Sequence, residues 1–312
     1  MILTVTMNPS IDMAYTLDTL AIDTVNRTAD VRKTAGGKGL NVSRVLHLMK
    51  HDLTATGVLG GYFGQYIEAQ LDRDGIGHSF THIDQESRNS IAILHDGGDQ
   101  TEILEAGPTL SEADADAFMA HFDDLLDQTT LVTISGSLPG GLASDFYAKM
   151  VAHAKAKHVD VLLDSSGASL KAGLDAPDKP LLIKPNEDEL GALLNTTVDK
   201  HDLTALRQHL SDAVFDGVAW IVVSLGAAGA FVKHLDRFYQ VTIPKINVVN
   251  PVGSGDSTLA GLALALDNHA SDDVVMKTAM TTGMLNTMEA ETGFVNPALF
   301  DTYFNQVTVK EV

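Results

Sequence analysis

The sequence predicts an α/β protein in which helices cover both faces of a mostly parallel sheet. Short runs of β-branched and apolar residues recur along the chain, each bounded by turn-forming residues, as buried parallel strands are. Helical patterns lie between these runs, and in one of them Phe118, Phe122 and Leu126 fall on a single face. Alternating strands and helices are typical of a sheet between two helical layers. The predicted strands are residues 2–6, 131–135, 159–163, 181–184 and 220–224.

Two segments, about 10–34 and 87–105, alternate polar and apolar residues without helical periodicity. In the second, residues 90–95 followed by Asp96-Gly97-Gly98 predict a β-hairpin. We therefore expect a single domain over residues 1–312, from which these two pieces project as a small β-sheet. Such a sheet is suited to act as a lid. The alternative is an additional edge of the main sheet.

The composition narrows the class of protein. A chain of 312 residues with 45% hydrophobic composition suffices for one large α/β domain. The absence of cysteine excludes disulfides, thiolate metal sites and thiol nucleophiles. The formal net charge of −20 argues against nucleic-acid binding, which needs a basic surface. No stretch approaches the roughly 18 apolar residues of a membrane span, and the N-terminus lacks the basic segment of a signal peptide. We therefore expect a cytoplasmic protein that binds neither nucleic acid nor membranes.

The clearest candidate for a chemical site is Gly253-Ser254-Gly255-Asp256, which opens a predicted helix. The glycines let a ligand approach the backbone, and the free N–H groups and dipole of a helix start attract an anion such as a transferring phosphoryl group. At the edge of this anion hole, Asp256 could accept a proton from an attacking hydroxyl. The alternative is a glycine-rich turn in which Asp256 caps the helix.

Three other positions beside predicted strands are candidates for ligand binding. Gly36-Gly37-Lys38 precedes a helical pattern and could form a second anion site, the alternative being a turn that leads into the helix. The chain lacks the Gly-x4-Gly-Lys-Ser/Thr pattern, which excludes a Walker-type phosphate loop. Asp12 follows the first strand, where a short carboxylate can hold two adjacent hydroxyls of a ligand or serve as a turn residue. Arg88 begins the hairpin and could clamp a phosphate, its alternative being a solvated strand residue.

The pairing of Gly253-Ser-Gly-Asp256 with Thr34-Ala-Gly-Gly-Lys-Gly-Leu-Asn41 resembles the phosphofructokinase B (ribokinase-like) family of carbohydrate kinases, over the whole chain. The resemblance implies a ribokinase-like three-layer sandwich with a β-sheet lid, and ATP and Mg²⁺ as cofactors. It implies that Asp256 is the catalytic base, with Gly253, Ser254 and Gly255 as the anion hole. The residues implied to bind the sugar phosphate are Asp12, Gly37, Lys38, Asn41 and Arg88. Those implied to bind the nucleotide are Lys184, Asn186, Ser224, Gly226, Gly229, Gly283 and Asn286, with Glu189 assigned to Mg²⁺.

Some of these implied roles have structural alternatives. Glu189 lies in an acidic helix start, where carboxylates favour the helix dipole. Gly283 and Asn286 could instead serve helix packing. Arg27 is a further candidate for the substrate phosphate, against a solvated surface role. Asn250 stands where many family members carry aspartate, at a position tied to activation by monovalent cations, which puts potassium dependence in doubt.

Within the family, the residues flanking the motifs are most similar to those of tagatose-6-phosphate kinases, and bacterial 1-phosphofructokinases share most of them. The resemblance thus implies phosphorylation of tagatose 6-phosphate to the 1,6-bisphosphate, with fructose 1-phosphate as the alternative acceptor. It also implies a homodimer formed through the lid. Two other classes of protein share parts of this pattern. A nucleotide-linked oxidoreductase would need Gly-x-Gly-x-x-Gly directly after a strand, most often the first, and the first strand here leads into Met7-Asn-Pro-Ser-Ile-Asp12. A non-catalytic sugar-phosphate sensor on a kinase fold is the other.

Overall fold

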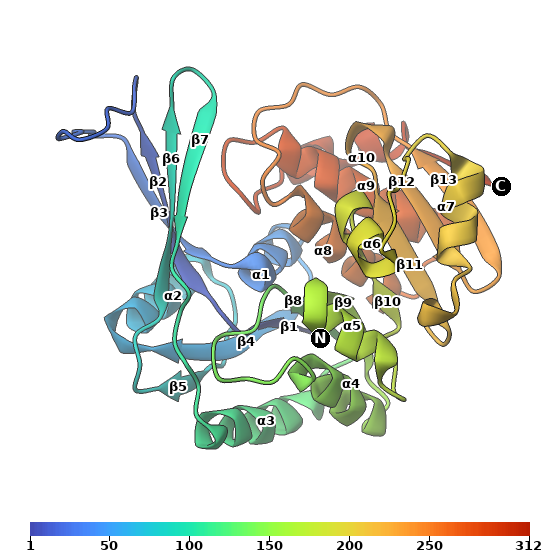
Figure 1. Cartoon of the computed structure of the whole chain (residues 1–312), viewed down its shortest axis with the longest axis horizontal. Coiled ribbons are helices and arrows are strands. Elements are labelled where there is room, and N and C mark those ends of the chain that lie inside the picture. The colour runs from blue at the N-terminus through green and yellow to red at the C-terminus, as the bar shows by residue number, and fades with distance from the viewer.

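The computed structural model describes residues 1–312 and confirms the predicted α/β class. A ten-stranded sheet runs in the order β14-β13-β12-β11-β10-β9-β8-β1-β4-β5, and its strands from β11 to β5 are parallel (Figure 1). The parallel strands are β1 (Ile2–Thr6), β4 (Leu53–Gly60), β5 (Thr81–Ile83), β8 (Leu131–Ser135), β9 (Asp160–Asp164), β10 (Leu182–Ile183) and β11 (Trp220–Ser224). Three antiparallel strands extend one edge: β12 (Ala230–His234), β13 (Arg237–Thr242) and β14 (Thr308–Glu311).

Helices cover both faces of this sheet and bury a separate apolar cluster on each. On one face pack α1 (Lys38–Leu48), α2 (Gly61–Asp74), α8 (Ser254–Asp267), α9 (Asp272–Thr287) and α10 (Phe300–Phe304). On the other pack α3 (Glu112–Leu126), α4 (Phe146–Ala156), α5 (Gly167–Asp175), α6 (Glu187–Leu194) and α7 (Leu203–Leu210). The predicted face of α3 is the buried one, since Phe118, Phe122 and Leu126 all lie in the core. Three short 3₁₀ turns complete the chain: η1 (Ala213–Phe215), η2 (Gly226–Ala228) and η3 (Pro297–Leu299).

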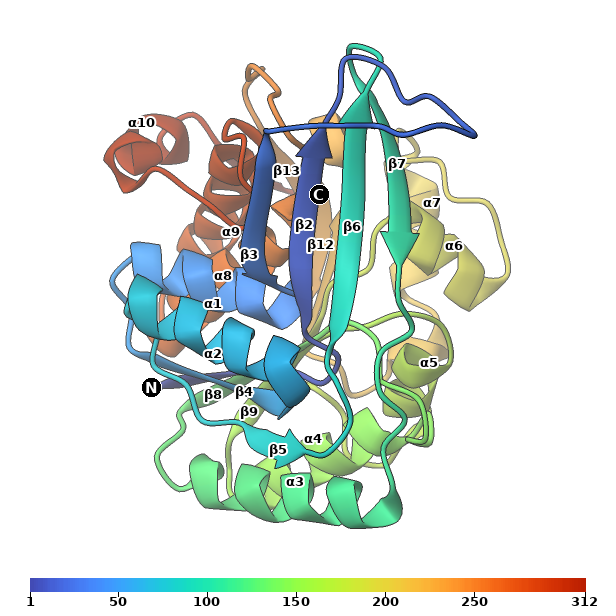
Figure 2. The same cartoon turned by 90° about the vertical axis from the view of Figure 1, so that its left-hand side faces the viewer.

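A second sheet of four strands stands beside the main body. Its order is β3-β2-β6-β7, and its central pair, β2 and β6, is parallel (Figure 2). The strands are β2 (Ser10–Thr16), β3 (Val31–Gly36), β6 (Arg88–His95) and β7 (Asp99–Leu104). Because side chains alternate along a strand, Asp12, Ala14, Ser90 and Ala92 share the face that lines a cavity against the body. We call this second sheet the lid sheet.

The opposite face of the lid sheet is turned away from the body (Figure 2). Its central strands carry apolar residues. Ile91 pairs with Met13 on one side and with Ile103 on the other, and Tyr15 pairs with Ile93. Ile103 is 54% exposed. We call this the outer face of the lid sheet.

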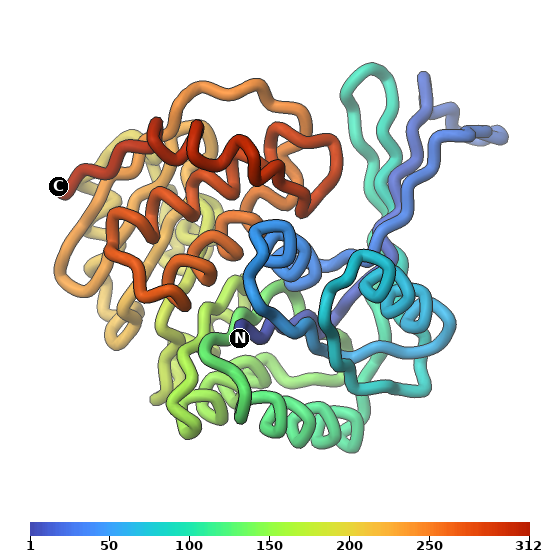
Figure 3. The backbone as a smooth tube through the Cα atoms, turned by 180° about the vertical axis from the view of Figure 1, so that it is seen from behind, coloured from blue at the N-terminus to red at the C-terminus, as the bar shows by residue number.

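Helices α1 and α8, which carry the two glycine-rich motifs, lie next to each other on the same face of the main sheet (Figure 3). Asn41 and Asp256, far apart in the sequence, are thereby brought into direct contact. None of the helices has both the length and the apolar character needed to cross a membrane.

Candidate active site

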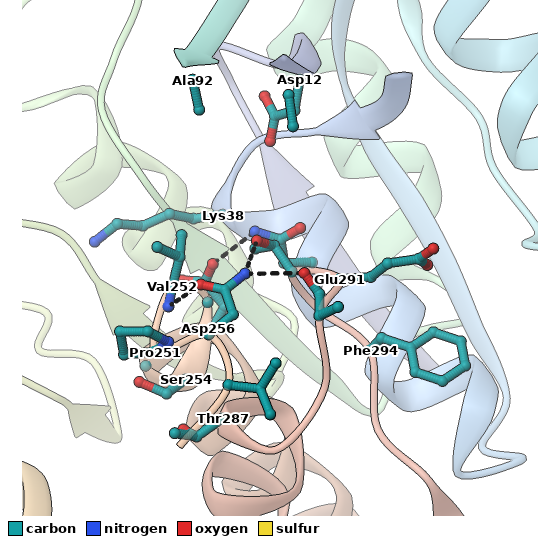
Figure 4. Close-up of a pocket in the computed structure, with 18 of the residues that line it drawn as sticks. Asp12, Lys38, Ala92, Pro251, Val252, Ser254, Asp256, Thr287, Glu291 and Phe294 are labelled. Carbon is teal, nitrogen blue, oxygen red and sulfur yellow. Dashed lines mark hydrogen bonds between the residues drawn. The ribbon is translucent and has the colours of Figure 1, made fainter. Parts of the chain in front are cut away.

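A cavity of about 2360 Å³ lies between the lid sheet and the carboxyl ends of the parallel strands, where α/β folds bind ligands. Both glycine-rich motifs open into it, and Figure 4 shows Asp12 on the lid side facing Lys38 and Asp256 on the body side. The cavity is lined by all but one of the predicted site residues: Asp12, Gly37, Lys38, Asn41, Arg88, Lys184, Asn186, Glu189, Ser224, Gly226, Gly229, Gly253, Ser254, Gly255, Asp256 and Gly283.

The start of α8 presents backbone donors to this cavity. Gly253 precedes the helix with φ of 79°, and a side chain there would place its Cβ 2.6 Å from Thr292 Cγ2, so only glycine fits. The amides of Gly253, Gly255 and Asp256 form no hydrogen bond within the chain, whereas the Ser254 amide donates to the Pro251 carbonyl at 3.3 Å. The available donors are therefore those of residues 253, 255 and 256, which modifies the prediction that included Ser254.

Asp256 combines burial with a strong electrostatic environment. Its side chain is 6% exposed, and its Oδ2 accepts a hydrogen bond from Asn41 Nδ2 at 2.8 Å. Burial, followed by the negative charge of Asp164, raises the pKa of Asp256 to about 6, although Asn41, Lys38 and Lys184 act in the opposite direction. A carboxylate with such a pKa is ionised at neutral pH and is a stronger base than an exposed aspartate.

Two lysines supply positive charge around the anion hole. Lys184 is 5% exposed, and its Nζ lies 3.4 Å from Asp164 Oδ2. The same Nζ would lie 3.3 Å from a Cβ built on Gly255, so it sits directly beside the start of α8. Lys38 projects into the cavity from the start of α1, and the charge of Asp164, followed by those of Asp256 and Glu189, raises its pKa against the effect of burial. Both lysines therefore line the cavity near the start of α8, where they can neutralise a bound anion.

Asp164 is a site residue to which the sequence assigned no role. It ends β9, is 2% exposed, and its Oδ2 accepts no hydrogen bond. The available signal was its position directly after a predicted strand. Only the tertiary structure shows that its charge acts on Lys38, Lys184 and Asp256 together.

Asn186 and Glu189 form a reciprocal cap at the start of α6. The Glu189 amide donates to Asn186 Oδ1 at 2.8 Å, and the Asn186 amide donates to Glu189 Oε2 at 2.9 Å. Both residues line the cavity, but this cap gives each of them a structural task as well. Glu189 Oε1 forms no hydrogen bond and stays available to a ligand.

The lid side of the cavity holds Asp12 and Arg88. Ser10 Oγ donates to Asp12 Oδ1 at 2.7 Å, and burial raises the pKa of Asp12 while the hydrogen bond and the charge of Arg88 oppose that rise. Arg88 Nε donates to the Asn8 carbonyl at 3.1 Å, which holds the guanidinium at the base of the lid sheet. Arg27 lies outside the cavity lining in this conformation.

The nucleotide side of the predicted site contains one exception. Ser224, Gly226 and Gly229 follow β11 and line the cavity, and Gly283 of α9 lies against Thr258 of α8. Asn286, by contrast, is fully buried and does not line the cavity. Its Nδ2 donates to the Val252 carbonyl at 2.8 Å and its Oδ1 accepts from the Gly293 amide at 2.7 Å. Its side-chain amide therefore joins two loops and does not face the cavity.

Comparisons with known proteins agree with this geometry. Residues 5–299 match the profile described as "pfkB family carbohydrate kinase". A Staphylococcus aureus structure described as a "putative phosphofructokinase" is 30% identical, with a TM-score of 0.86 over 100% of this chain and 99% of that one. Phosphofructokinase-2 from Escherichia coli, in complex with potassium, is 24% identical with a TM-score of 0.88, covering 97% and 98% of the two chains. A Thermotoga maritima protein described as "possible 1-phosphofructokinase" is 23% identical with a TM-score of 0.88, covering 100% and 99%.

Proposed function

This chain belongs to the pfkB family of carbohydrate kinases, and we propose that it transfers the γ-phosphoryl group of ATP to a hydroxyl of a ketohexose phosphate. The observation that carries the proposal is the buried Asp256 carboxylate, which lies beside the free backbone donors of the α8 start and within reach of two lysines. A base next to an anion hole is the arrangement that in-line phosphoryl transfer to an alcohol requires.

In the proposed mechanism Asp256 accepts the proton of the attacking sugar hydroxyl as the new oxygen–phosphorus bond forms. The bond between the γ-phosphorus and the bridging β–γ oxygen breaks in the same step, and ADP leaves. The amides of Gly253, Gly255 and Asp256 then face the oxygens of the transferring group, and Lys184 beside them stabilises the charge that shifts toward the β-phosphate. On the lid side, Asp12 holds sugar hydroxyls and Arg88 the phosphate that the substrate already carries. Enclosure by the lid sheet would exclude water and limit hydrolysis of ATP.

The cavity also suits MgATP. Mg²⁺ prefers oxygen ligands and is usually held by one or two carboxylates together with substrate phosphates. Glu189 Oε1 forms no hydrogen bond, and Asp164 Oδ2 has the Lys184 ammonium 3.4 Å away but accepts no hydrogen bond, so these two carboxylates would be the ones to hold the ion. When bound with ATP, Mg²⁺ supplies neutralisation of the triphosphate charge.

Among the ketohexose phosphates we favour tagatose 6-phosphate, from the residues that flank the motifs. Its 1-hydroxyl would attack, whereas fructose 1-phosphate would react through its 6-hydroxyl, and both products are 1,6-bisphosphates. The 30% identical S. aureus relative is described as a phosphofructokinase, and this favours a fructose phosphate as the second candidate.

The deciding experiment is an ADP-release assay with MgATP, in which tagatose 6-phosphate, fructose 1-phosphate and fructose 6-phosphate are offered separately. We expect tagatose 6-phosphate to give the highest kcat/KM. We expect Asp256→Asn to lower kcat by about 10²–10⁴-fold, the usual contribution of a general base. If a fructose phosphate gives the higher kcat/KM, the proposed substrate is wrong and the proposed mechanism stands. No ADP release with any of the three would leave a sugar-phosphate-binding protein as the better description.

A further inference from the structure

Arg44 of α1 is a half-buried arginine at the centre of several contacts behind the catalytic groups. Its Nη1 donates to Asn41 Oδ1 at 3.2 Å and to the Thr292 carbonyl at 3.1 Å. Its Nη2 donates to the Ala35 carbonyl at 2.5 Å, near the end of the lid strand β3. Arg44 itself touches neither the base nor the anion hole, so any effect on them passes through its partners.

The contact with Asn41 fixes which way that side-chain amide points. A guanidinium has only donors, so the atom of Asn41 that faces Arg44 must be the oxygen. The NH₂ group is thereby left facing Asp256, and it donates to Oδ2 at 2.8 Å. Rotating the amide by half a turn would place donor against donor at Arg44 and a carbonyl oxygen against the carboxylate, and both contacts would be repulsive.

The surroundings leave this pair little room to rearrange. Gly293 packs on it with φ of 69°, and a Cβ at that position would lie 2.9 Å from both Arg44 Nη1 and Asn41 Oδ1. The Gly293 amide also donates to Asn286, which in turn donates to the Val252 carbonyl just before the anion hole. The loop that holds Arg44 is therefore tied to the backbone from which α8 begins.

We propose that Arg44 is a positioning residue that orients the Asn41 amide so that it donates to Asp256 and keeps the carboxylate in its reactive, ionised form. The inference rests on the proposed role of Asp256 as base. Its further claim is that the orientation of Asn41 depends on Arg44. The charged groups that face Asp256 are Asp164, Lys38 and Lys184, and those that face Arg44 are Asp12, Asp74 and Glu291. None of these is substituted in the test, but Arg44→Met also removes a charge that lowers the pKa of Asp12, and the double variant of Arg44→Met with Asn41→Ala separates that effect.

The test compares Arg44→Met and Arg44→Lys with the wild type in the pH dependence of kcat/KM. With Met, Asn41 is free to turn its oxygen toward Asp256, which favours the protonated acid, so the acid limb should move up by about one pH unit. We expect kcat to fall about threefold at pH 6.5 and to approach a tenfold loss below about pH 5.5, while KM for ATP stays unchanged. Arg44→Lys keeps a donor-only side chain and should retain the wild-type acid limb. Ionisation of the substrate phosphate affects all variants equally, so only differences between variants count.

Arg207→Met is the matched control, because Arg207 also donates to a backbone carbonyl, that of Val312, but far from the cavity. It should leave the acid limb where it is. Asn41→Asp supplies a test that needs no change at Arg44: a second carboxylate facing Asp256 should raise the acid limb by more than Arg44→Met does. In an Asn41→Ala background, Arg44→Met should cause no further shift.

Three outcomes would overturn the inference: an unchanged acid limb in Arg44→Met, an unchanged limb in Asn41→Asp, or additive effects in the double variant. If Arg44→Met does not fold, Arg44→Gln takes its place, because a glutamine can present its carbonyl oxygen to the Asn41 amide and should also raise the acid limb. The proposed role of Asp256 as base is tested separately, since wild-type activity in Asp256→Asn would contradict it.

Discussion

Asp256 is held in a place where its ionised form is costly to the folded protein. Burial and the charge of Asp164 raise its pKa to about 6, from an ordinary value of 3.8. The folded state therefore binds this proton more tightly than the unfolded state does. The stability of the fold falls as pH rises from about 3.8 to about 6, and the loss is complete above that window.

Asp256→Asn is expected to stabilise the protein at neutral pH, because the amide removes a buried charge and can still accept the hydrogen bond from Asn41. The gain should approach about 3 kcal/mol at pH 7.5, the equivalent of the pKa shift, and should be clearly smaller at pH 4.5. Urea denaturation of both proteins at the two pH values measures it. An equal effect at both pH values would show that the carboxylate is not strained by its surroundings.

Single residues also show how far the sequence can lead. The Gly253–Asp256 segment could be recognised because glycines at a helix start have a local meaning. Asp164 could not, since one aspartate after a strand has no signature until three other charges gather around it. The same holds for Arg44, whose partners come from β3, from α1 and from the loop around Thr292.

Among the secondary-structure elements, the start of α8 is the one whose backbone amides bind the transferring phosphoryl group in the proposed mechanism. Its geometry depends on the left-handed conformation of Gly253 and on the close approach of Thr292. Both features must hold for the amides of residues 253, 255 and 256 to face the same anion.

Gly253→Ala should therefore lower both stability and activity. Left-handed backbone costs a residue with a Cβ roughly 1–2 kcal/mol, and the contact with Thr292 adds to this. We expect a loss of about 2–3 kcal/mol in the free energy of unfolding and a kcat at least about tenfold lower, since one oxyanion donor alone is worth that much.

Gly167→Ala is the matched control. Gly167 at the start of α5 also has positive φ, of 56°, but has no atom within 4 Å of a built Cβ and lies outside the cavity. Gly167→Ala should lower the free energy of unfolding only by the cost of the left-handed backbone, roughly 1–2 kcal/mol, and should keep the wild-type kcat. Equal losses of activity in both variants would mean that the start of α8 has no special role.

The start of α6 shows why sequence alone leaves some roles open. Asn186 and Glu189 match the family's Asn-x-x-Glu signature, and the same spacing is a capping box. In the folded chain the two residues cap the helix and line the cavity at once, so one pattern has two physical explanations.

At the scale of the whole molecule, the alternation of strands and helices was enough to predict the layered body. The three antiparallel strands at its edge were not predicted. Two of them, β12 and β13, are joined by Leu235-Asp236, which lacks the Asn-Gly or Asp-Gly pattern that marks a hairpin in a sequence. The polar–apolar alternation of residues 10–34 and 87–105 corresponds to the strands of the lid sheet.

The outer face of the lid sheet supports the proposed homodimer. Its apolar residues would be covered if the lid sheets of two copies packed face to face. Ile103→Glu should then weaken the dimer about 10²-fold or more, since the substitution occurs in both copies, and sedimentation velocity would show the shift to monomer.

Leu104→Glu is the control for that experiment. Leu104 is the next residue of β7, is 60% exposed, and points to the cavity face, so it should leave the dimer intact. A wild-type protein that sediments as a monomer at all concentrations would remove the dimer proposal.

The parallel pairing of β2 with β6 has a consequence for how the chain folds. Ser10 pairs with Arg88, and α1, β4, α2 and β5 lie between them in the sequence. Pairing over such a long loop is slow, so the first half of the body should collapse before the lid sheet closes. Until β6 arrives, β2 offers an open edge to other chains. Refolding at high protein concentration should therefore fail first by aggregation through β2. Pairing with β6 covers that edge and prevents this aggregation.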